Sequence, residues 1–368
     1  MTSTVRRVIG ATRLLSLAAV CIGTLITGAH AEDWKAIEAA SQKEGRVLVY
    51  STLRPENWKP IIAAFQAKYN WLKLETLRVG SHNEAFERYR AEAASGTRTA
   101  DIVLASSVDR WSKLSTSHQL IDFTPEHIGD VPEPFRPKEK GYYTFAVEPQ
   151  IFVYNKLLLP PNLAPKGMND LANKVAKNPA VFKGRISSYN PLVSPFAYSI
   201  YWSLLKHHGA DEFWKDMNAL GPAMKMEATT GAQVDKILTG EYLVGFVLPE
   251  TLLPKLDATR GKVLSFVYPE DGTPLSPRSM AVMKGGQDPN AAKLLINFLL
   301  SREGQVAMAK GGTTVYWPGV EKEADLPTLA EFMASATNTK KIADVTFFPE
   351  MESQRQDFTA RMKKALGQ

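Results

Sequence analysis

Residues 142–154, YYTFAVEPQIFVY, are the stretch that decides the fold of this 368-residue chain. Aromatic and β-branched residues dominate it, and this composition favours an extended strand. A proline-rich break follows at residues 160–165. We interpret residues 142–154 as a strand that crosses from one lobe of the protein to another.

On the N-terminal side of this strand, short apolar segments alternate with helical ones. Residues 47–50 (VLVY) and 101–105 (DIVLA) are predicted strands. Between them, Ile61, Phe65 and Tyr69 fall on one face of a predicted helix. This alternation predicts parallel strands joined by helices.

A second series of the same kind follows the crossing strand. It contains predicted strands at residues 185–188 and 243–248, with helices at 196–207 and 211–220, and residues 279–283 are a predicted return strand. The fold class is therefore α/β, with two lobes joined by crossover strands. Because open α/β sheets bind ligands at the carboxyl ends of their strands, we expect a ligand site in the cleft between the lobes.

Residues 1–31 are typical of a cleaved secretory signal peptide. Arg6, Arg7 and Arg13 precede or begin the mostly apolar run 14–26, and Ala29-His30-Ala31 forms a small-x-small cleavage site. The apolar run is shorter than the roughly 20 residues that a membrane-spanning helix needs. We therefore predict export, by the general or the twin-arginine route.

Removal of residues 1–31 changes both the thiol content and the charge. The only cysteine, Cys21, lies in this segment, so the mature chain has no thiol and forms no disulfide. The segment contains three arginines and no acidic residue, so the formal charge falls from +6 to +3. Such a mild excess does not predict nucleic-acid binding, which requires clustered basic residues. The remaining 337 residues suffice for about two domains.

The sequence shows no catalytic motif. None of the histidines forms a metal-ligand spacing with another histidine or a cysteine, and no nucleophile elbow, phosphate-binding loop or dinucleotide motif occurs. Glu250 or Asp271 could serve acid–base chemistry, so a secreted enzyme stays an alternative. We expect a binding protein with no metal and no cofactor.

The loops after the predicted strands carry hydroxyls, amides and one arginine. These groups suit an oxyanion bound at helix N-termini, with the arginine making a forked contact. Each serine or threonine could instead only cap its helix, and the arginine could form an exposed ion pair. The candidate solute-binding residues are Ser51, Arg54, His82, Ser106, Ser107, Ser188, Tyr189, Asn190, Thr229, Thr230 and Glu250.

Six short segments, in order along the chain, resemble a known family. They are Val49-Tyr50-Ser51, residues 100–103 (ADIV), 153–156 (VYNK), 239–241 (TGE), 268–273 (YPEDGT) and 298–305 (FLLSREGQ). With them, the chain resembles the substrate-binding proteins of bacterial ABC importers, in the branch that includes ferric-ion-binding proteins. The resemblance implies a type II periplasmic-binding-protein fold with a hinge of crossover strands and a central ligand cleft.

The same resemblance brings a ligand set that this chain does not match. Ferric-binding members use two adjacent tyrosines, a histidine and a glutamate, and the matching positions here hold Glu250-Thr251, Arg54 and Ser106. A threonine supplies no phenolate and an arginine repels Fe³⁺. We therefore expect a small anionic solute, and ferric iron or a ferric chelate is the alternative.

The complete prediction is a periplasmic solute-binding component of an ABC importer. Residues 1–31 are the signal peptide, 32–150 and 270–368 form lobe 1, and 151–269 form lobe 2. The solute is of the phosphonate, phosphate ester or carboxylate type. The partners are an inner-membrane ABC permease and its ATPase, and we expect a monomer that binds no nucleic acid.

Overall fold

The computed structural model describes residues 32–255, 259–324, 327–339, 342–344 and 348–368. Residues 33–368 form one compact unit. The predicted signal peptide, with Cys21, lies outside the described residues. Within the described ranges, no helix is both long enough and apolar enough to cross a membrane.

The first sheet begins with three parallel strands at one edge. Their order is β2 (Lys73–Arg78), β1 (Arg46–Ser51) and β3 (Ile102–Ala105). Two antiparallel strands follow, β10 (Thr273–Met283) and β5 (Tyr143–Asn155), and the short strands β4 (Leu120–Ile121) and β11 (Ile342–Asp344) also pair with β10. The helices of this part are α1 (Trp34–Glu44), α2 (Pro55–Lys68), α3 (His82–Ala94), α4 (Val108–Thr116), α11 (Pro289–Leu300), α12 (Arg302–Lys310) and α13 (Leu329–Thr339).

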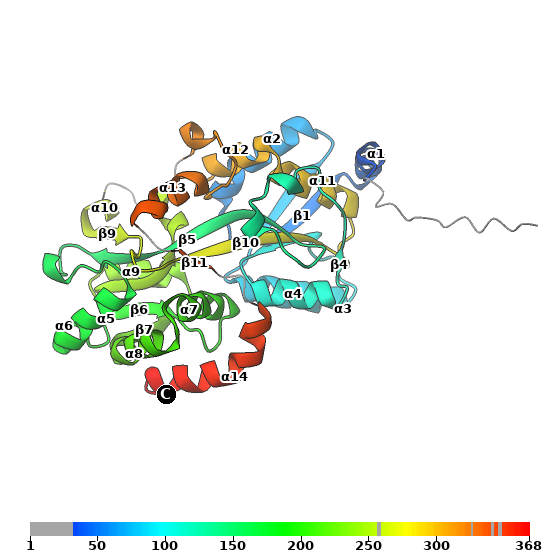
Figure 1. Cartoon of the computed structure of the whole chain (residues 1–368). Coiled ribbons are helices and arrows are strands. Elements are labelled where there is room, and N and C mark those ends of the chain that lie inside the picture. Colours follow the sequence, from blue (N-terminus) through cyan, green and yellow to red (C-terminus); the bar gives the residue numbers. More distant parts are fainter. Residues whose placement is uncertain (1–31, 256–258, 325–326, 340–341, 345–347) are drawn as a thin grey trace, which may run out of the picture. The chain divides into compact units, whose positions relative to one another are not determined.

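Strand β5 belongs to two sheets. Its first half, through Pro149, pairs with β10, and its second half, from Gln150 onward, pairs with β8 (Val244–Pro249) and β9 (Leu264–Val267). Figure 1 shows β5 and β10 running side by side through the middle of the compact unit. The crossing strand predicted from residues 142–154 is confirmed.

The second sheet continues from β8 in parallel. Strand β8 pairs with β6 (Ile186–Tyr189), which pairs with β7 (Met224–Glu227) at the edge. Its helices are α5 (Met168–Lys177), α6 (Pro179–Phe182), α7 (Pro195–His208), α8 (Ala210–Leu220), α9 (Thr230–Leu238) and α10 (Arg260–Val263). The alternation predicted from the sequence is therefore present on both sides of the crossing strand.

Separate hydrophobic clusters lie on the two sheets. The largest cluster of the first sheet includes Trp58, Phe65, Phe145 and Phe298, and its members come from residues 37–147 and 275–332. The largest cluster of the second sheet is built around Trp202, Phe213 and Phe246. Burial of such large side chains is the main free-energy source that holds each sheet to its helices.

The C-terminal helix α14 (Phe348–Ala365) packs on the part of the protein that the lobe prediction did not assign to it. Met351, Phe358 and Met362 are buried in the cluster of the second sheet, where Phe358 contacts Trp214 with ring centroids 5.4 Å apart. The apolar face of α14 therefore packs on the core of the second sheet, whereas only its polar side chains Glu352 and Arg355 reach α4. The helical spacing of these apolar residues predicts a buried face, but it does not say which core that face joins.

Candidate functional site

A cavity of about 640 Å³ lies where the parallel strands of both sheets end. The residues that line it follow the carboxyl ends of six strands: Thr52 after β1, Val79 after β2, Ser107 after β3, Asn190 after β6, Ala228 after β7 and Thr251 after β8. Both sheets therefore contribute to one site. Its volume is within the range of about 300–1,000 Å³ that small-molecule sites usually have.

Five helices begin at the wall of this cavity. Their N-cap residues, all of which line it, are Arg54 of α2, Ser81 of α3, Ser107 of α4, Ser194 of α7 and Thr229 of α9. The first backbone N–H groups of a helix have no intrahelical acceptor, and the helix dipole places partial positive charge there. The cavity is therefore surrounded by donors suited to an anion.

Three of these N-cap hydroxyls already accept one hydrogen bond from their own helix. Ser81 accepts from the Glu84 N–H, and Thr229 accepts from the Ala232 N–H, each over 3.2 Å. Ser194 makes the equivalent contact with Ala197. Because the hydroxyl hydrogen is not used in such a cap, each of these groups can still donate to a ligand.

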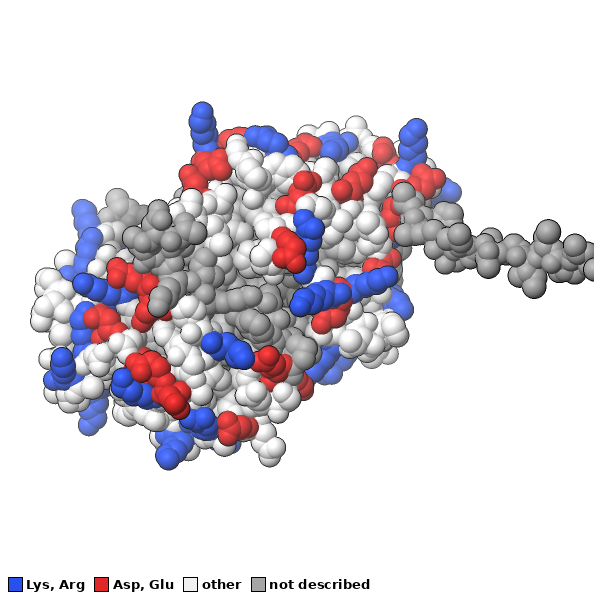
Figure 2. Space-filling view, in the orientation of Figure 1, with Lys and Arg blue, Asp and Glu red and all other residues white. Residues whose placement is uncertain are grey.

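Two exposed arginines add positive charge to the cavity wall. Arg54 precedes α2 and Arg78 ends β2. Within the described part of the chain, neither forms an ion pair. On the face of the protein drawn in Figure 2, lysine and arginine are interspersed with acidic residues. Glu227 also lines the cavity, but its carboxylate is taken by Lys236 at 2.8 Å and by the Tyr242 hydroxyl at 2.6 Å.

The floor of the cavity holds a buried ion pair on the two crossing strands. The Arg278 guanidinium of β10 lies 2.8 Å from the Glu148 carboxylate of β5, and the two side chains are 6% and 1% exposed. Arg278 also donates to the Thr52 hydroxyl at 3.3 Å. The pair cancels its own charge, so the excess positive charge of the site comes from the wall.

His82 is a neutral donor at the first turn of α3. Burial lowers the pKa of His82 to about 3, and the nearby positive charge of Arg278 contributes in the same direction. The Ser106 N–H donates to the His82 Nδ1 at 3.3 Å, so the proton of the neutral ring is on Nε2. The ring also lies 5.2 Å from that of Phe196, which starts α7 on the second sheet. His82 and Phe196 thus meet across the cavity.

Tyr189, at the end of β6, is an un-ionised phenol. Burial raises the pKa of Tyr189 to about 12. Its hydroxyl is hydrogen-bonded to the Thr230 hydroxyl, and its ring contacts Phe196 edge-on, with centroids 5.5 Å apart. The side chain therefore offers a hydroxyl and an aromatic edge to the cavity and carries no charge.

The structure brings seven of the eleven predicted site residues to the cavity wall. They are Arg54, His82, Ser107, Tyr189, Asn190, Thr229 and Thr230. The other four are Ser51, Ser106, Ser188 and Glu250, and they do not line it.

Three of these four side chains have hydrogen-bond partners inside the protein, whereas the fourth, the Ser106 hydroxyl, has none among the described residues. Ser51 accepts from the Trp58 indole at 3.0 Å, and Ser188 pairs with the Tyr201 hydroxyl at 2.7 Å. Ser106 supports His82 through its backbone, and Glu250 accepts from Thr314 at 3.0 Å and from Tyr268. Each lies at or next to the end of a strand, where the pleat turns alternate side chains away from the cavity. The structure therefore places these four residues beside the cavity wall and not on it, unlike the other seven predicted residues.

Sequence reasoning missed Arg78, Glu148, Phe196, Glu227 and Arg278, all of which line the cavity. For Glu148 and Arg278 a signal existed, because a charged residue inside an otherwise apolar strand is costly unless it has a partner or a function. Arg78 and Glu227 are the last residues of their strands, and nothing in their neighbours distinguishes them from surface charges.

The carboxylates of the enzyme alternative do not meet at the cavity. Asp271 accepts the backbone N–H groups of Met168 and Asn169, at 3.0 and 2.9 Å, and so caps α5. Glu250 lies in a separate hydrogen-bond network with Thr314. Among the described residues, no cluster of three or more histidine, cysteine or acidic side chains could hold a metal ion.

Residues 60–348 match the family model of bacterial extracellular solute-binding proteins. A protein of Haemophilus influenzae, described as uncharacterized, is 23% identical over 285 residues, which cover 76% of this chain and 80% of that protein. This match extends the similarity over most of both sequences but adds no information about the solute.

Solved structures share the fold at low sequence identity. The substrate-binding protein of an ABC transporter from Agrobacterium tumefaciens has a TM-score of 0.74 at 22% identity, covering 87% of this chain and 94% of that one. The periplasmic binding protein AfuA from Actinobacillus pleuropneumoniae, with fructose-6-phosphate bound, has a TM-score of 0.69 at 21% identity, covering 87% and 99%. Iron-bound HitA from Pseudomonas aeruginosa has a TM-score of 0.65 at 17% identity, covering 85% and 98%. These neighbours confirm the predicted type II periplasmic-binding-protein fold, and the family model shows that the chain belongs to the bacterial extracellular solute-binding proteins.

Proposed function

We propose that this protein is the periplasmic solute-binding component of an ABC importer and that it captures a small anionic solute in the cavity between its two sheets. The observation that carries the proposal is the convergence on one cavity of five helix N-termini and of two exposed arginines that form no ion pair with any described residue. Each of these elements favours negative charge on the ligand.

The solute class that fits best is a phosphate ester, a phosphonate or a carboxylate. An oxyanion accepts several hydrogen bonds at once, and the site offers helix N–H groups, hydroxyls, the His82 Nε2–H and two guanidinium groups. The cavity has room for more than the anionic group alone. The structural neighbour AfuA, which holds fructose-6-phosphate, supports a phosphate ester as the first compound to test.

A ferric solute fits the donor set less well. Fe³⁺ needs hard anionic ligands, such as phenolates and carboxylates. Tyr189 is held as a phenol by its raised pKa, and the carboxylates that line the cavity, Glu148 and Glu227, are already bonded to Arg278 and Lys236. HitA binds iron on the same fold, so a ferric chelate is kept as one arm of the test.

The proposed mechanism is a population shift between an open and a closed form. We take the elements on the first sheet as lobe 1 and the elements on the second sheet, with α14, as lobe 2. A ligand that contacts Arg54 and Arg78 of lobe 1 and Thr229 of lobe 2 stabilises the closed form, because these contacts exist together only there. The permease and its ATPase then act on the closed, loaded form.

Export to the periplasm rests on two observations. The sequence of residues 1–31 has the basic, apolar and small-residue regions of a signal peptide, and the family is one of extracellular proteins. Mass spectrometry of the protein from the periplasmic fraction should find the new N-terminus at Glu32. A chain that still carries residues 1–31 after export would contradict this part of the proposal.

The test of the solute class is thermal unfolding of the metal-free protein against fructose-6-phosphate, simple phosphonates, carboxylates and ferric citrate. A ligand at 100 times its dissociation constant stabilises the native state by about 2.7 kcal/mol, which raises the unfolding midpoint measurably. We expect at least one phosphorylated or carboxylated compound to raise it, and Arg54→Ala with Arg78→Ala to remove that rise.

The matched control is Arg90→Ala. Arg90 is exposed on α3, pairs with Glu87 on the same helix and does not line the cavity. The substitution removes one positive charge without changing the site, so the ligand should still raise the unfolding midpoint. The anion proposal is wrong if ferric citrate alone raises the midpoint. It is also wrong if the protein with Arg54→Ala and Arg78→Ala responds to the ligand like wild type.

A further inference from the structure

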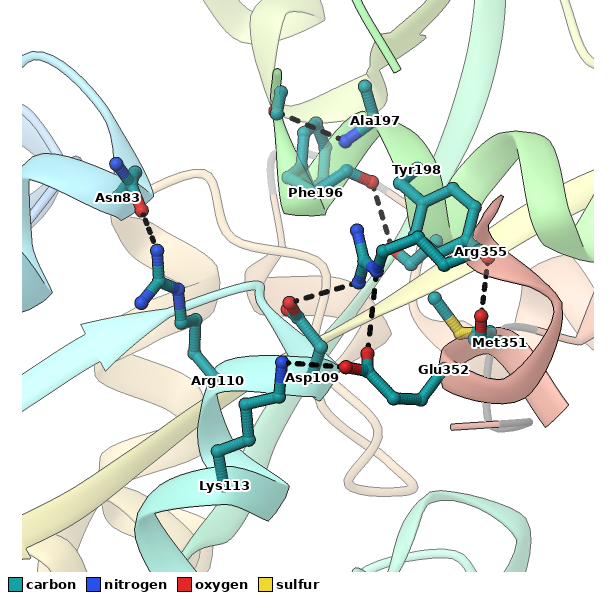
Figure 3. Close-up of polar contacts among 12 residues, drawn as sticks. Asn83, Asp109, Arg110, Lys113, Phe196, Ala197, Tyr198, Met351, Glu352 and Arg355 are labelled. Atoms are coloured by element: carbon teal, nitrogen blue, oxygen red, sulfur yellow. Dashed lines mark hydrogen bonds and ion pairs between the residues drawn. The ribbon is translucent and has the colours of Figure 1, made fainter. Parts of the chain in front are cut away.

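Helix α14 contacts both lobes at once. Its apolar face is anchored in lobe 2, where Phe358 contacts Tyr198 with ring centroids 4.8 Å apart. Close backbone approach fixes its end, because a side chain added at Gly221 would lie 1.9 Å from the Ala365 carbonyl oxygen. Its polar face carries Glu352 and Arg355, which reach α4 of lobe 1 (Figure 3).

Four charged side chains form this contact. The Arg355 guanidinium lies 3.5 Å from the Asp109 carboxylate, and the Lys113 Nζ lies 3.2 Å from the Glu352 carboxylate. Glu352 and Arg355 also pair with each other at 3.4 Å. Charges from α4 and α14 therefore alternate in sign along the contact, and each cross-lobe pair joins lobe 1 to lobe 2.

Arg355 is held in place from the lobe 2 side. Its guanidinium lies 4.3 Å from the centre of the Tyr198 ring, and the Tyr198 hydroxyl donates to the Met351 carbonyl at 2.6 Å. A cation over an aromatic ring is attracted to its face. The stacking orients Arg355 toward Asp109 before the lobes meet.

The contact lies directly behind the cavity. Asp109 comes two residues after Ser107, the N-cap of α4, and Tyr198 comes four residues after Ser194, the N-cap of α7. Both N-caps line the cavity, whereas Asp109, Tyr198 and Arg355 do not. The contact therefore lies about one helical turn or less from two helix starts that line the cavity, and none of these three residues belongs to the cavity lining.

We propose that Asp109, Lys113, Glu352 and Arg355 form a clasp that sets the ratio of closed to open protein and so tunes solute affinity from outside the site. The proposal rests on the opening and closing of the lobes described above, but not on the solute being an anion. The Lys113–Glu352 pair is about half-exposed, and in the other pair Arg355 is partly exposed whereas Asp109 is buried. Ion pairs that are open to solvent contribute modestly, so the clasp favours closure without locking it.

The other Asp109 oxygen explains why the clasp releases. Asp109 is 4% exposed, and within the described residues its Oδ1 has no hydrogen-bond partner. A buried carboxylate oxygen without a donor costs free energy, and opening returns it to water. Part of the attraction of Arg355 is thereby offset.

The test measures the distance between the lobes in the absence of any solute. Residues 32–368 contain no cysteine, so Lys59→Cys and Lys225→Cys introduce the only two thiols for spin labels. Both positions are exposed and outside the cavity lining, one on α2 of lobe 1 and the other on β7 of lobe 2. Electron–electron double resonance then gives the populations at short and long distance.

We expect Arg355→Ala to lower the ratio of short to long distances by about three- to five-fold, the effect of losing a pair worth up to roughly 1 kcal/mol. The matched control is Arg361→Ala, since Arg361 is also on α14 and its guanidinium lies 4.6 Å from the centre of the Trp214 ring of lobe 2. This control should leave the ratio at the wild-type value. Circular dichroism melting verifies that every variant is folded.

Asp109→Asn supplies a second, independent variant. Combined with Arg355→Ala, it should shift the distance ratio by less than the sum of the two single changes, because both changes remove the same pair. An unchanged ratio in Arg355→Ala, an equal shift in Arg361→Ala, or full additivity of the two clasp variants would overturn the clasp. Failure of anion binding would leave these measurements untouched, so the two proposals fail separately.

Discussion

The wall and the floor of the cavity use arginine in opposite ways. On the wall, Arg54 and Arg78 are exposed and form no ion pair within the described residues. On the floor, Arg278 is buried and bonded to Glu148. The comparison separates charge that is available to a ligand from charge that the fold itself requires. It predicts that substitution of the wall arginines changes ligand binding, whereas substitution of Arg278 changes the free energy of unfolding.

The largest expected effect is on the floor. Arg278→Ala leaves the Glu148 carboxylate buried without its partner, and breaking such a pair costs about 3–5 kcal/mol of unfolding free energy. Urea denaturation measures the loss. Replacing both residues together, Glu148→Leu with Arg278→Met, should recover most of the stability, since no charge is then left buried. A loss below 1 kcal/mol in Arg278→Ala would show that the floor is as tolerant as the wall.

An intermediate effect is expected at His82, between wall and floor. The folded protein holds the pKa of His82 at about 3, whereas the unfolded chain has a value near 6.5, so the unfolded state binds the proton first as the pH falls. The titration of His82 therefore leaves the free energy of unfolding unchanged above about pH 6.5. As the pH falls from about 6.5 to 3, it lowers that free energy progressively.

The difference in unfolding free energy between wild type and His82→Gln isolates this contribution from other titrating groups, such as Asp216 and Asp288, whose pKa values are raised to about 6. The difference should be constant above pH 7 and should shift against wild type as the solution is acidified. If this difference in unfolding free energy does not depend on pH, His82 has the same pKa in the folded and the unfolded protein and is more hydrated than the floor.

The smallest expected effect is on the wall. The double variant Arg54→Ala and Arg78→Ala should change the free energy of unfolding by less than about 0.5 kcal/mol, as is usual for exposed residues without partners. The same urea titration used for Arg278→Ala measures it. A loss of more than 1 kcal/mol would assign the wall arginines a structural role and would weaken the contrast with the floor.

The fold could be predicted from local patterns because those patterns express local physics. The aromatic and β-branched run at residues 142–154 fixes an extended strand, and alternating strands and helices fix parallel sheets. Helix α14 shows the limit. Its buried residues Met351, Phe358 and Met362 predict an apolar face, but the choice between two cores depends on contacts with residues more than a hundred positions away.

The candidate site could be predicted where it depends on strand ends and helix starts. Arg54, Ser107 and Thr229 were found because a polar residue before a helix and after a strand must lie at the carboxyl edge of a parallel sheet. Ser51 and Ser188 were misplaced by a single pleat, since a shift of one position turns a strand residue to the opposite face. Arg278 was missed because its role depends on an ion pair with Glu148, which lies 130 positions earlier in the sequence.

The position of α14 in the sequence also affects the order in which the chain can fold during synthesis. The core around Tyr198, Trp202 and Phe213 is made by residues 152–247, but it is completed by residues 351–365. Until that last segment has been synthesised, these aromatic side chains lack their cover, and exposed apolar surface is prone to aggregation. A stop codon before Met351 would therefore leave the second half of the molecule without its final layer, even though every strand of its sheet had already been translated.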